Sequence, residues 1–322
     1  MGFIRKRLLG NKKRINTLRK KGQNFPLTVI TGSSGFIGSQ VIELFNQYKS
    51  RLLLPSSKKL DIVNTQLVEK FLSKNRPQIF INFASFTNLA EAEKQRGDKN
   101  GLTWKLNVKA TENIAKTCRK HNIFLIQIST DSVFPGTAKF PGPYSEKTIP
   151  PDKLKSLGWY SYTKLKGEEK VKKSGCNFAI IRISYPFGNI HSEKDFVAKT
   201  IKYIQEEIPL FKDQYFTPTF IPDLAKTLEV IITRKRNGIY HVACQEPTTP
   251  FEFAVHLAKK LSIRSKIKSQ KLKESIGEKG WVPRAKYGGL LIGQTQNTLN
   301  LKFHSWQKAA DKFIYQYETQ TN

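Results

Sequence analysis

A tyrosine and a lysine four positions apart can together donate a proton to a carbonyl oxygen. Tyr160 and Lys164 have this spacing, which on a helix places both side chains on one face. The lysine can lower the pKa of the phenol and hold the ribose of a nicotinamide, while the phenol donates its proton as hydride arrives. One such pair is expected by chance in a lysine-rich chain with 11 tyrosines. The pair therefore takes its meaning from its position in the fold.

Hydroxyl side chains end the apolar run that precedes this pair. The run Ile123–Ile128 continues into Ser129, Thr130 and Asp131. A hydroxyl at the end of a strand can hydrogen-bond a carbonyl oxygen and share its developing negative charge. Thr130 is the first candidate for this role and Ser129 is the alternative. Alone, the tripeptide would be explained by helix or turn capping, but with the tyrosine and lysine it indicates carbonyl reduction.

A glycine series lies near the start of the chain. Gly32, Gly35 and Gly38 follow the apolar run Leu27–Thr31, and a helical pattern begins at Phe36. Residues without a Cβ let backbone N–H groups and a helix N-terminus reach a pyrophosphate. The spacing alone is weak evidence, because about one chain in ten of this length would contain it by chance. Its place between strand and helix favours a dinucleotide site over a merely tight turn.

The residues after the second apolar run bear on the choice of cofactor. Leu52–Leu54 is followed by Pro55, two serines and two lysines, with no carboxylate. An acidic residue there would hold the ribose 2′-hydroxyl and repel a 2′-phosphate. Ser57 and Lys58 therefore favour NADPH, with NADH as the alternative. Asp61 could bond the adenine edge or only cap the next helix.

Short apolar runs and helical patterns alternate through the first half of the chain. Strands are predicted at Leu27–Thr31, Leu52–Leu54, Gln78–Phe83, Ile123–Ile128 and Phe178–Ile183, and helices at Phe36–Tyr48, Asn64–Lys74, Leu102–His121 and Tyr160–Lys173. This order predicts an α/β fold with a Rossmann-type, doubly wound parallel sheet.

The pattern becomes less regular after Pro186. Thr217–Pro222 and Gly238–Val242 are predicted to belong to a smaller C-terminal lobe that binds substrate. We therefore expect a basic arm at 1–25, an NAD(P)-binding domain at 26–185, and a mainly substrate-binding lobe at 186–322 with some return to the first domain. A pocket between the two lobes is a common place for a substrate.

Charge is the unusual feature of the composition. The chain has 55 basic and 25 acidic residues, a net charge of +30. The excess is dispersed, which is typical of a solvated lysine-rich surface, and no nucleic-acid motif accompanies it; no specific nucleic acid is expected. Residues 1–24 are denser, with nine Lys or Arg and no acid. They predict a weak contact with an anionic membrane, or else a disordered tail.

The remaining composition limits the class of protein. Cys118, Cys176 and Cys244 are too few and too scattered for a disulfide framework or a zinc site. They fit buried thiols in a reducing cytoplasm. No run approaches the roughly 18 apolar residues of a membrane span. We expect a cytoplasmic enzyme that holds no metal and that can form a homodimer.

In their order along the chain, these motifs resemble the extended short-chain dehydrogenase/reductases, and within them the dTDP-4-dehydrorhamnose reductase branch. The resemblance covers about residues 26–300. It is carried by Thr31–Gly38, Lys59–Asp61, Asn82–Thr87 with Glu93, Ile128–Gly136, Trp159–Glu168, Arg182–Gly188, Asp213–Thr219 and Asp223–Ala225.

The resemblance implies NAD(P)H-dependent reduction of a 4-keto-6-deoxy sugar nucleotide in deoxysugar or surface polysaccharide biosynthesis. It assigns Thr130, Tyr160 and Lys164 as catalytic residues. It implies that Asn82, Ala84 and Ser85 lie in a segment beneath the cofactor and that Asn107 holds a structural helix position. The cofactor contacts expected from the motifs and the resemblance together are Gly32, Ser34, Gly35, Phe36, Ile37, Gly38, Ser57, Lys58, Asp61, Ile62, Ala84 and Ser85, with Tyr160 and Lys164. It implies substrate contacts at Thr87, Ser129, Asp131, Val133, Phe134, Thr217, Thr219 and Arg284.

The chain also departs from the family pattern. Ser132 stands where an aromatic is usual, the segment Pro141–Trp159 is longer than usual, and Ala90 and Ala285 replace an Asp and a Pro. The last two fall near the substrate side, so they bear on which sugar nucleotide is bound.

Other functions remain open from the sequence. An epimerase or dehydratase of the same fold is one, although a dehydratase would need a second carboxylate beside Thr130. A non-catalytic NADP-binding regulatory subunit is another. Nucleic-acid binding rests on charge alone.

Overall fold

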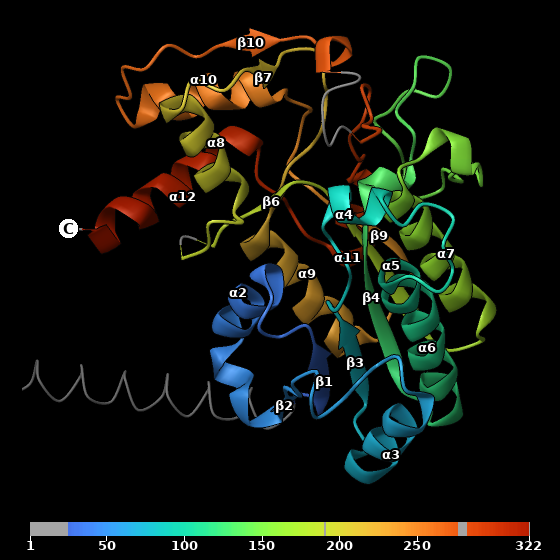
Figure 1. The fold of residues 1–322 in the computed structure, drawn as a ribbon. Helices are drawn as coiled ribbons and strands as arrows, with labels where there is room; N and C mark the ends of the chain where they lie inside the picture. The colour runs from blue at the N-terminus through green and yellow to red at the C-terminus, as the bar shows by residue number, and fades with distance from the viewer. Residues whose placement is uncertain (1–24, 190, 276–281, 322) are drawn as a thin grey trace, which may run out of the picture.

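A six-stranded parallel sheet forms the centre of the computed structural model, which describes residues 25–189, 191–275 and 282–321. Its strands are β1 (Thr28–Thr31), β2 (Leu52–Leu53), β3 (Ile79–Asn82), β4 (Phe124–Thr130), β5 (Phe178–Ile183) and β9 (Gly238–Val242). They lie in the order β2-β1-β3-β4-β5-β9 (Figure 1). Because β2 and β3 pair on opposite sides of β1, the chain changes direction there and leaves a crevice at the carboxyl ends.

Helices cover both faces of this sheet. On one face lie α2 (Phe36–Leu44) and α9 (Ile221–Arg234); on the other lie α3 (Thr65–Asn75), α6 (Ala110–Lys120) and α7 (Trp159–Lys173). Neighbouring strand residues face opposite cores: Ile30 packs with the first set and Val29 with the second. The structure thereby confirms the predicted Rossmann-type sheet, whose strands are apolar because both faces are buried.

Several boundaries differ from the predicted ones. The first helix ends at Leu44 and continues as a 3-10 helix, η1 (Asn46–Arg51). The predicted helix Leu102–His121 is divided into α5 (Leu102–Trp104), a π-helical turn η2 (Lys105–Lys109) and α6. Such π turns interrupt the regular hydrogen bonding and often occur at functional sites.

The assignment of Gly238–Val242 to the smaller lobe was wrong. This segment is β9, an edge strand of the main sheet paired with β5 from Ala179 to Ile183. The helix before it, α9, also packs on that sheet. A short strand containing Gly, Tyr and His has no strong apolar run, so local pattern alone does not reveal its long-range pairing.

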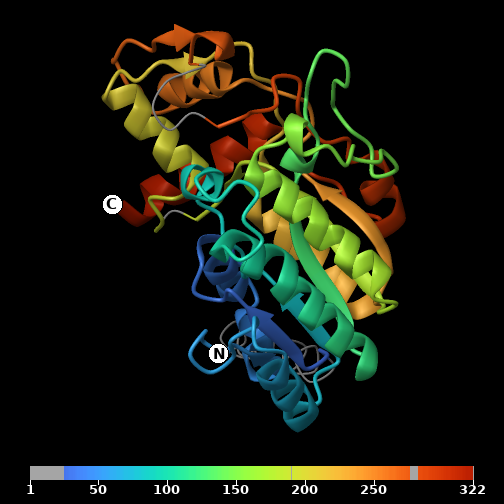
Figure 2. The same ribbon diagram turned by 45° about the vertical axis from the view of Figure 1, so that its right-hand side comes forward.

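A second lobe lies beyond one end of the sheet (Figures 1 and 2). It contains α8 (Phe196–Gln205), α10 (Pro250–Lys260) and α12 (Trp306–Thr321), packed around Phe187, Phe253 and Phe313. Two small parallel pairs belong here: β6 (Pro186–Phe187) with β8 (Thr219–Phe220), and β7 (Leu210–Phe211) with β10 (Ser269–Gln270).

The remaining short elements of the described chain are α4 (Leu89–Glu93), η3 (Asp131–Val133), η4 (Leu154–Ser156), η5 (Leu272–Ser275) and α11 (Gly293–Leu299).

Two further expectations concern the basic N-terminal segment and membrane-spanning helices. The basic segment 1–24 lies outside the described residues, so its membrane contact stays a prediction. In the part of the chain that is described, no helix combines the length and apolar character needed to cross a membrane.

Candidate active site

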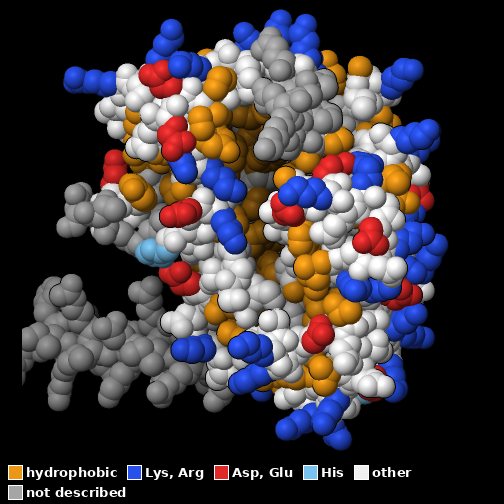
Figure 3. Space-filling model, in the orientation of Figure 1, with side chains coloured by type: hydrophobic (Ala, Val, Ile, Leu, Met, Phe, Trp, Pro, Cys, Tyr) orange, Lys and Arg blue, Asp and Glu red, His pale blue; other side chains and the backbone are white. Residues whose placement is uncertain are grey.

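A cavity of about 270 Å³ opens between the sheet and the second lobe. Figure 3 shows the molecule hollowed here, with hydrophobic side chains inside the hollow. Its walls come from the end of β4, the start of α7, the residues after β5, the loop before β8 and the segment 282–288. These segments lie far apart in the sequence, and the carboxyl ends of the parallel strands bring them together.

Thr130 and Asp131 form one wall at the end of β4. The Thr130 Oγ1 lies 3.2 Å from Asp131 Oδ1 and 3.1 Å from Ser132 Oγ. The Ser184 hydroxyl donates to Asp131 Oδ2 at 2.6 Å. Burial raises the pKa of Asp131 to about 6, although hydrogen bonds from Ser184 and Thr130 oppose the shift.

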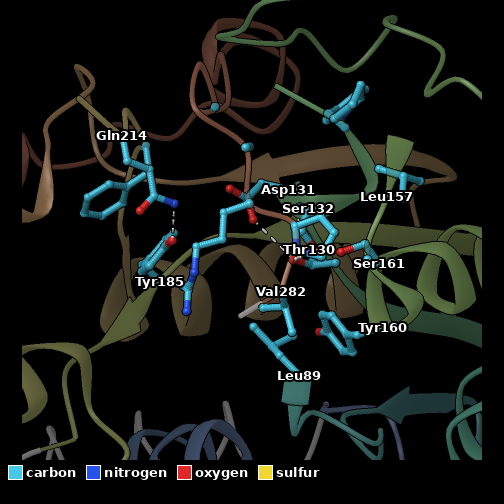
Figure 4. A pocket seen from close by; sticks show the side chains of 18 of the residues that line it. Leu89, Thr130, Asp131, Ser132, Leu157, Tyr160, Ser161, Tyr185, Gln214 and Val282 are labelled. Carbon is cyan, nitrogen blue, oxygen red and sulfur yellow. Dashed lines mark hydrogen bonds between the residues drawn. The ribbon is translucent and has the colours of Figure 1, made fainter. Parts of the chain in front are cut away.

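Tyr160 lies in the first turn of α7 and reaches the same cavity (Figure 4). Burial and the negative charge of Asp131 raise the pKa of its phenol, while a hydrogen bond with Thr130 opposes the rise. The phenol is therefore protonated at neutral pH, as a proton donor must be. The expectation of a lowered phenol pKa is not met in this arrangement, because burial and the Asp131 charge both raise it.

Lys164 lies one helical turn beyond Tyr160 and is itself buried. Its Nζ donates a hydrogen bond to the carbonyl oxygen of Ile128 at 2.7 Å. Burial lowers the pKa of Lys164 to about 8, and the nearby Glu168 carboxylate works against that shift. The ammonium is thus held near the end of β4, one helical turn along α7 from Tyr160.

The glycine loop lies closely against the end of β3. Gly32 has a φ of +69°, and a Cβ there would lie 2.6 Å from the backbone nitrogen of Ala84. A Cβ on Gly38 would lie 2.3 Å from the carbonyl oxygen of Gly32. Only glycine fits at these two positions, so the loop can approach Ala84 and present the start of α2 to a ligand.

A second hollow lies at the start of α2. Ser34, Gly35 and Phe36 line it together with Asn189 and Lys194. Asn189 Nδ2 donates to the carbonyl oxygen of Phe36 at 3.1 Å, so the loop after β6 is fixed over the glycine loop. Small residues, a helix N-terminus and a lysine fit a pyrophosphate. Asn189 and Lys194 were missed by the sequence analysis, because only the fold brings them to the glycine loop.

The other predicted cofactor residues lie in the segment between β2 and α3. Ser57 and Lys58 are exposed in the turn after β2. Asp61 accepts a hydrogen bond from the backbone N–H of Val63 at 2.9 Å, so it caps the local turn. The side chain of Ile62 is buried in the core, and its contact with the cofactor stays a prediction.

Asn107 joins the cofactor side to the catalytic helix. Its Oδ1 accepts hydrogen bonds from the Ser85 hydroxyl at 2.9 Å and the Phe86 N–H at 2.8 Å. Its Nδ2 donates to Thr163 Oγ1 on α7 at 3.0 Å. The π turn η2 therefore places one amide where it holds the segment after β3 against α7.

The structure distinguishes between the two hydroxyl candidates at the end of β4. Thr130 lines the cavity, whereas Ser129 is buried and donates to Glu168 Oε1 at 2.6 Å. Successive side chains of a strand point to opposite faces, so only one of the two can face the substrate. The expectation of a substrate contact at Ser129 is corrected by this geometry.

Three other predicted substrate residues also point elsewhere. Val133 is fully buried in the core. Thr219 Oγ1 accepts from the Ser184 N–H and donates to the Val242 carbonyl. Thr217 Oγ1 accepts from the Leu290 N–H, and its side chain borders a separate hollow. Matching a family motif locates a segment, but it does not determine which side chains the local backbone turns inward.

The remaining predicted substrate residues do line the cavity. These are Thr87, Asp131, Phe134 and Arg284. Tyr185 and Gln214 also line the cavity, across from Tyr160 (Figure 4), although neither was predicted from the sequence. Gln214 Nε2 donates to Tyr185 Oη at 2.9 Å. Tyr185 has a φ of +40°, a strained value for a residue with a side chain; its place two residues after the end of β5 could have marked it.

Comparison with known proteins agrees with this geometry. Residues 27–319 match the model of the RmlD substrate binding domain family. The chain belongs to this family. The predicted relation to the extended short-chain dehydrogenase/reductases is thereby confirmed.

Individual relatives extend over most of the chain. The NADP complex of dTDP-4-dehydrorhamnose reductase from Bacillus anthracis is 27% identical, with a TM-score of 0.79 over 91% of this chain and 99% of its own. The dTDP-4-keto-6-deoxy-D-glucose reductase of Streptomyces niveus is 26% identical over 70% of this chain and 75% of its own. The methionine adenosyltransferase 2 subunit beta of Xenopus laevis is 26% identical over 88% of both chains.

Proposed function

We propose that this protein uses NADPH to reduce the keto group of a 4-keto-6-deoxy sugar nucleotide. The observation that carries the proposal is the meeting of Thr130 and Tyr160 on one cavity, with Lys164 buried one turn below. The reductases of Bacillus anthracis and Streptomyces niveus support the substrate class, and the Bacillus anthracis structure contains NADP.

The side chains divide the reaction among them. The nicotinamide, when bound, supplies hydride to the carbonyl carbon. Tyr160 donates its phenolic proton to the carbonyl oxygen. The raised pKa of the phenol keeps that proton in place until the substrate is bound. The Thr130 hydroxyl donates a hydrogen bond to the same oxygen and stabilises its developing charge. Lys164 holds the nicotinamide ribose, while the Tyr160 phenol faces the substrate.

NADPH is the proposed cofactor and NADH the alternative. The glycine loop and the start of α2 would bind the pyrophosphate, and Ala84 with Ser85 would lie beneath the nicotinamide half. Lys58 is exposed after β2, where an acidic residue would otherwise select NADH. A cation at that place favours the extra phosphate of NADPH.

The far side of the cavity fits the nucleotide part of the substrate. Arg284 lies there with Tyr185 and Gln214. A guanidinium binds diphosphate oxygens in a two-pronged geometry, and the phenol and amide provide further polar groups. We infer that the sugar lies at the Tyr160 end and the diphosphate at the Arg284 end.

An epimerase or dehydratase mechanism fits the cavity less well. Among the described residues that line it, the carboxylates are Asp131 and Glu93. Glu93 pairs with Arg96 and accepts the backbone N–H of Trp159 at 2.8 Å. Both Glu93 oxygens are therefore used in structural contacts. Asp131 then has no second acid–base carboxylate beside Thr130 among the described residues that line the cavity.

A non-catalytic regulatory subunit is the second candidate. It is favoured by the match to the Xenopus laevis subunit beta, which covers more of the chain than the Streptomyces niveus reductase does. The presence of Thr130 and Tyr160 on one cavity, with Lys164 one helical turn along α7, supports the enzyme. Turnover of a keto sugar nucleotide by the purified chain decides between them.

The test is NADPH oxidation by the purified chain with a panel of 4-keto-6-deoxy sugar nucleotides. We expect turnover of at least one of them, and a loss of about 10²–10⁴-fold in kcat for Tyr160→Phe. The Kd of NADPH should stay within about twofold, because the phenol is not needed to hold the pyrophosphate. Unchanged turnover by the variant would refute the proposed mechanism, and NADPH binding without turnover of any substrate would favour the regulatory subunit.

The buried cysteines bear on the compartment in which the protein acts. We infer the cytoplasm, since Cys118, Cys176 and Cys244 are buried free thiols, which suit a reducing compartment. A homodimer and a weak membrane contact through residues 1–24 stay predictions.

A further inference from the structure

A row of hydroxyl groups crosses the cavity wall behind Thr130. The Ser161 hydroxyl, on α7, donates to Ser132 Oγ at 2.9 Å. Ser132 Oγ lies 3.1 Å from Thr130 Oγ1, and the Ser132 backbone N–H donates to the same Thr130 atom at 3.2 Å. Figure 4 shows these three side chains grouped on one side of the cavity. The row connects the catalytic helix to the end of the fourth strand.

Counting protons fixes the direction of each hydrogen bond. A hydroxyl has one proton to donate and two lone pairs to accept with. The Asp131 carboxylate, 3.2 Å from Thr130 Oγ1, can only accept when ionised. Thr130 therefore donates its proton to Asp131, so the Ser132 hydroxyl must donate to Thr130, and Ser161 donates to Ser132. All the protons of the row point the same way, toward Asp131.

This arrangement leaves Thr130 no lone pair for another donor. One lone pair accepts the Ser132 N–H and the other accepts the Ser132 hydroxyl. Thr130 is therefore a donor only, and its one proton turns between Asp131, 3.2 Å away, and the Tyr160 phenol oxygen. A hydroxyl that accepts a hydrogen bond is also the stronger donor. When a keto oxygen enters the cavity, the Thr130 proton can turn to it from Asp131, and the Tyr160 phenol, whose proton Thr130 does not accept, can donate to the same oxygen.

We propose that Ser132 and Ser161 are positioning residues, which hold the Thr130 hydroxyl as a donor toward the substrate's keto oxygen. The inference rests on the proposed reductase function, and it adds two residues that lie outside the Tyr160, Lys164 and Thr130 set. It also explains why a polar side chain, Ser132, directly follows Asp131. Ser132 acts directly on Thr130, whereas Ser161 acts only through Ser132.

The test is a set of variants assayed with the keto sugar nucleotide that the wild type reduces. Ser132→Ala should lower kcat about tenfold and Ser161→Ala about threefold, with the Kd of NADPH and the KM of the sugar nucleotide within about twofold. The double variant should resemble Ser132→Ala, because the two residues act in series. Ser132→Thr keeps the hydroxyl and should restore kcat to within about threefold of the wild type.

A matched control comes from the other end of α7. Ser174 donates its hydroxyl to the Val171 carbonyl at 2.7 Å and is partly buried. Ser174→Ala therefore loses a comparable hydrogen bond on the same helix, and it should leave kcat unchanged. If the Ser132 effect were only structural, the variants would lose thermal stability without a selective loss of kcat.

The outcomes separate this inference from the function on which it rests. A wild type that binds NADPH but reduces no keto sugar nucleotide overturns both. An active wild type whose Ser132→Ala variant keeps kcat within twofold overturns the positioning role alone. Multiplying effects in the double variant would also overturn it, since they would mean that the two serines act independently.

Discussion

Arg182 and Glu168 form a two-point ion pair beneath the active site. Arg182 Nη2 lies 2.7 Å from Glu168 Oε2 and its Nε lies 2.9 Å from Oε1, with both side chains fully buried. Burial would raise the pKa of Glu168, but the Arg182 charge and hydrogen bonds hold it below its usual value. The neighbouring His241 stays neutral, because burial and Arg182 lower its pKa to about 3. The pair joins α7 to β5, one helical turn beyond Lys164.

Glu168→Gln should be strongly destabilising. The change leaves the Arg182 charge buried without a counter-charge, which costs about 3–5 kcal/mol in the free energy of unfolding. Urea denaturation at pH 7 measures it. The double variant Glu168→Gln with Arg182→Met should recover part of that loss, because the uncompensated charge is then absent. A single variant within 1 kcal/mol of the wild type would mean that the pair is not desolvated as described.

The sheet could be predicted from the sequence because its signals are local. Runs such as Ile123–Ile128 are apolar throughout, since a parallel strand is buried on both faces, and helical patterns separate them. The glycine loop was located for a similar reason: Gly32 and Gly38 mark a backbone contact that no other residue fits. The catalytic roles of Thr130, Tyr160 and Lys164 could be predicted from their positions on these strands and helices.

What could not be predicted depends on long-range geometry. The pairing of β9 with β5 is decided by distant partners, and the segment itself carries no strong strand pattern. The side-chain directions of Thr217 and Thr219 depend on hydrogen bonds to Leu290 and Ser184, which no local pattern reports. Gln214 reaches Tyr185 only after the loop before β8 folds over the sheet.

The stability difference between Lys164→Met and the wild type should depend on pH. Burial lowers the folded-state pKa of Lys164 to about 8 from an ordinary value of 10.5. Below pH 8 the folded wild type holds a buried charge, and this cost disappears as pH rises through 8 to 10.5. The variant's advantage in the free energy of unfolding should therefore fall by about 2–3 kcal/mol over that range. Urea midpoints at pH 7 and pH 10.5 measure it, and a difference that is constant with pH would contradict the burial of the charge.

Lys58→Glu should change the cofactor preference. Lys58 is exposed after β2, where the 2′-phosphate of NADPH is proposed to lie. Reversing its charge should raise the Kd of NADPH about tenfold or more, since attraction becomes repulsion, while the Kd of NADH stays within about threefold. The effect on NADPH should shrink at high salt, because the site is open to solvent. Fluorescence titration with each cofactor at two salt concentrations gives these values.

A control with the same change in net charge is available on the second lobe. Lys202, exposed on α8, pairs with Glu206 at 3.8 Å. Lys202→Glu should leave both cofactor affinities unchanged. Equal losses for NADPH and NADH in Lys58→Glu would show that this side chain does not face the 2′-position.

Arg96 fastens the long segment before α7 to the rest of the site. Its Nη2 donates to the Leu157 carbonyl at 2.8 Å and its Nη1 to the Leu154 carbonyl at 3.2 Å. Its Nε pairs with Glu93, whose other oxygen accepts the Trp159 N–H at 2.8 Å. The segment 156–158 lines the cavity next to Tyr160, so the Arg96 hydrogen bonds help to shape the part of the cavity proposed to bind the substrate.

Arg96→Ala should therefore raise the KM of the sugar nucleotide about three- to tenfold, with a smaller effect on kcat and none on the Kd of NADPH. Two hydrogen bonds from a charged donor and one ion pair are lost, each worth about 1 kcal/mol or somewhat more. The glycine loop is on the other side of the crevice, so cofactor binding should not change. Lys94→Ala is the matched control, because Lys94 lies beside the same short helix α4 but pairs with Glu91 at 2.7 Å. Equal KM values for the two variants would show that the segment keeps its position without Arg96.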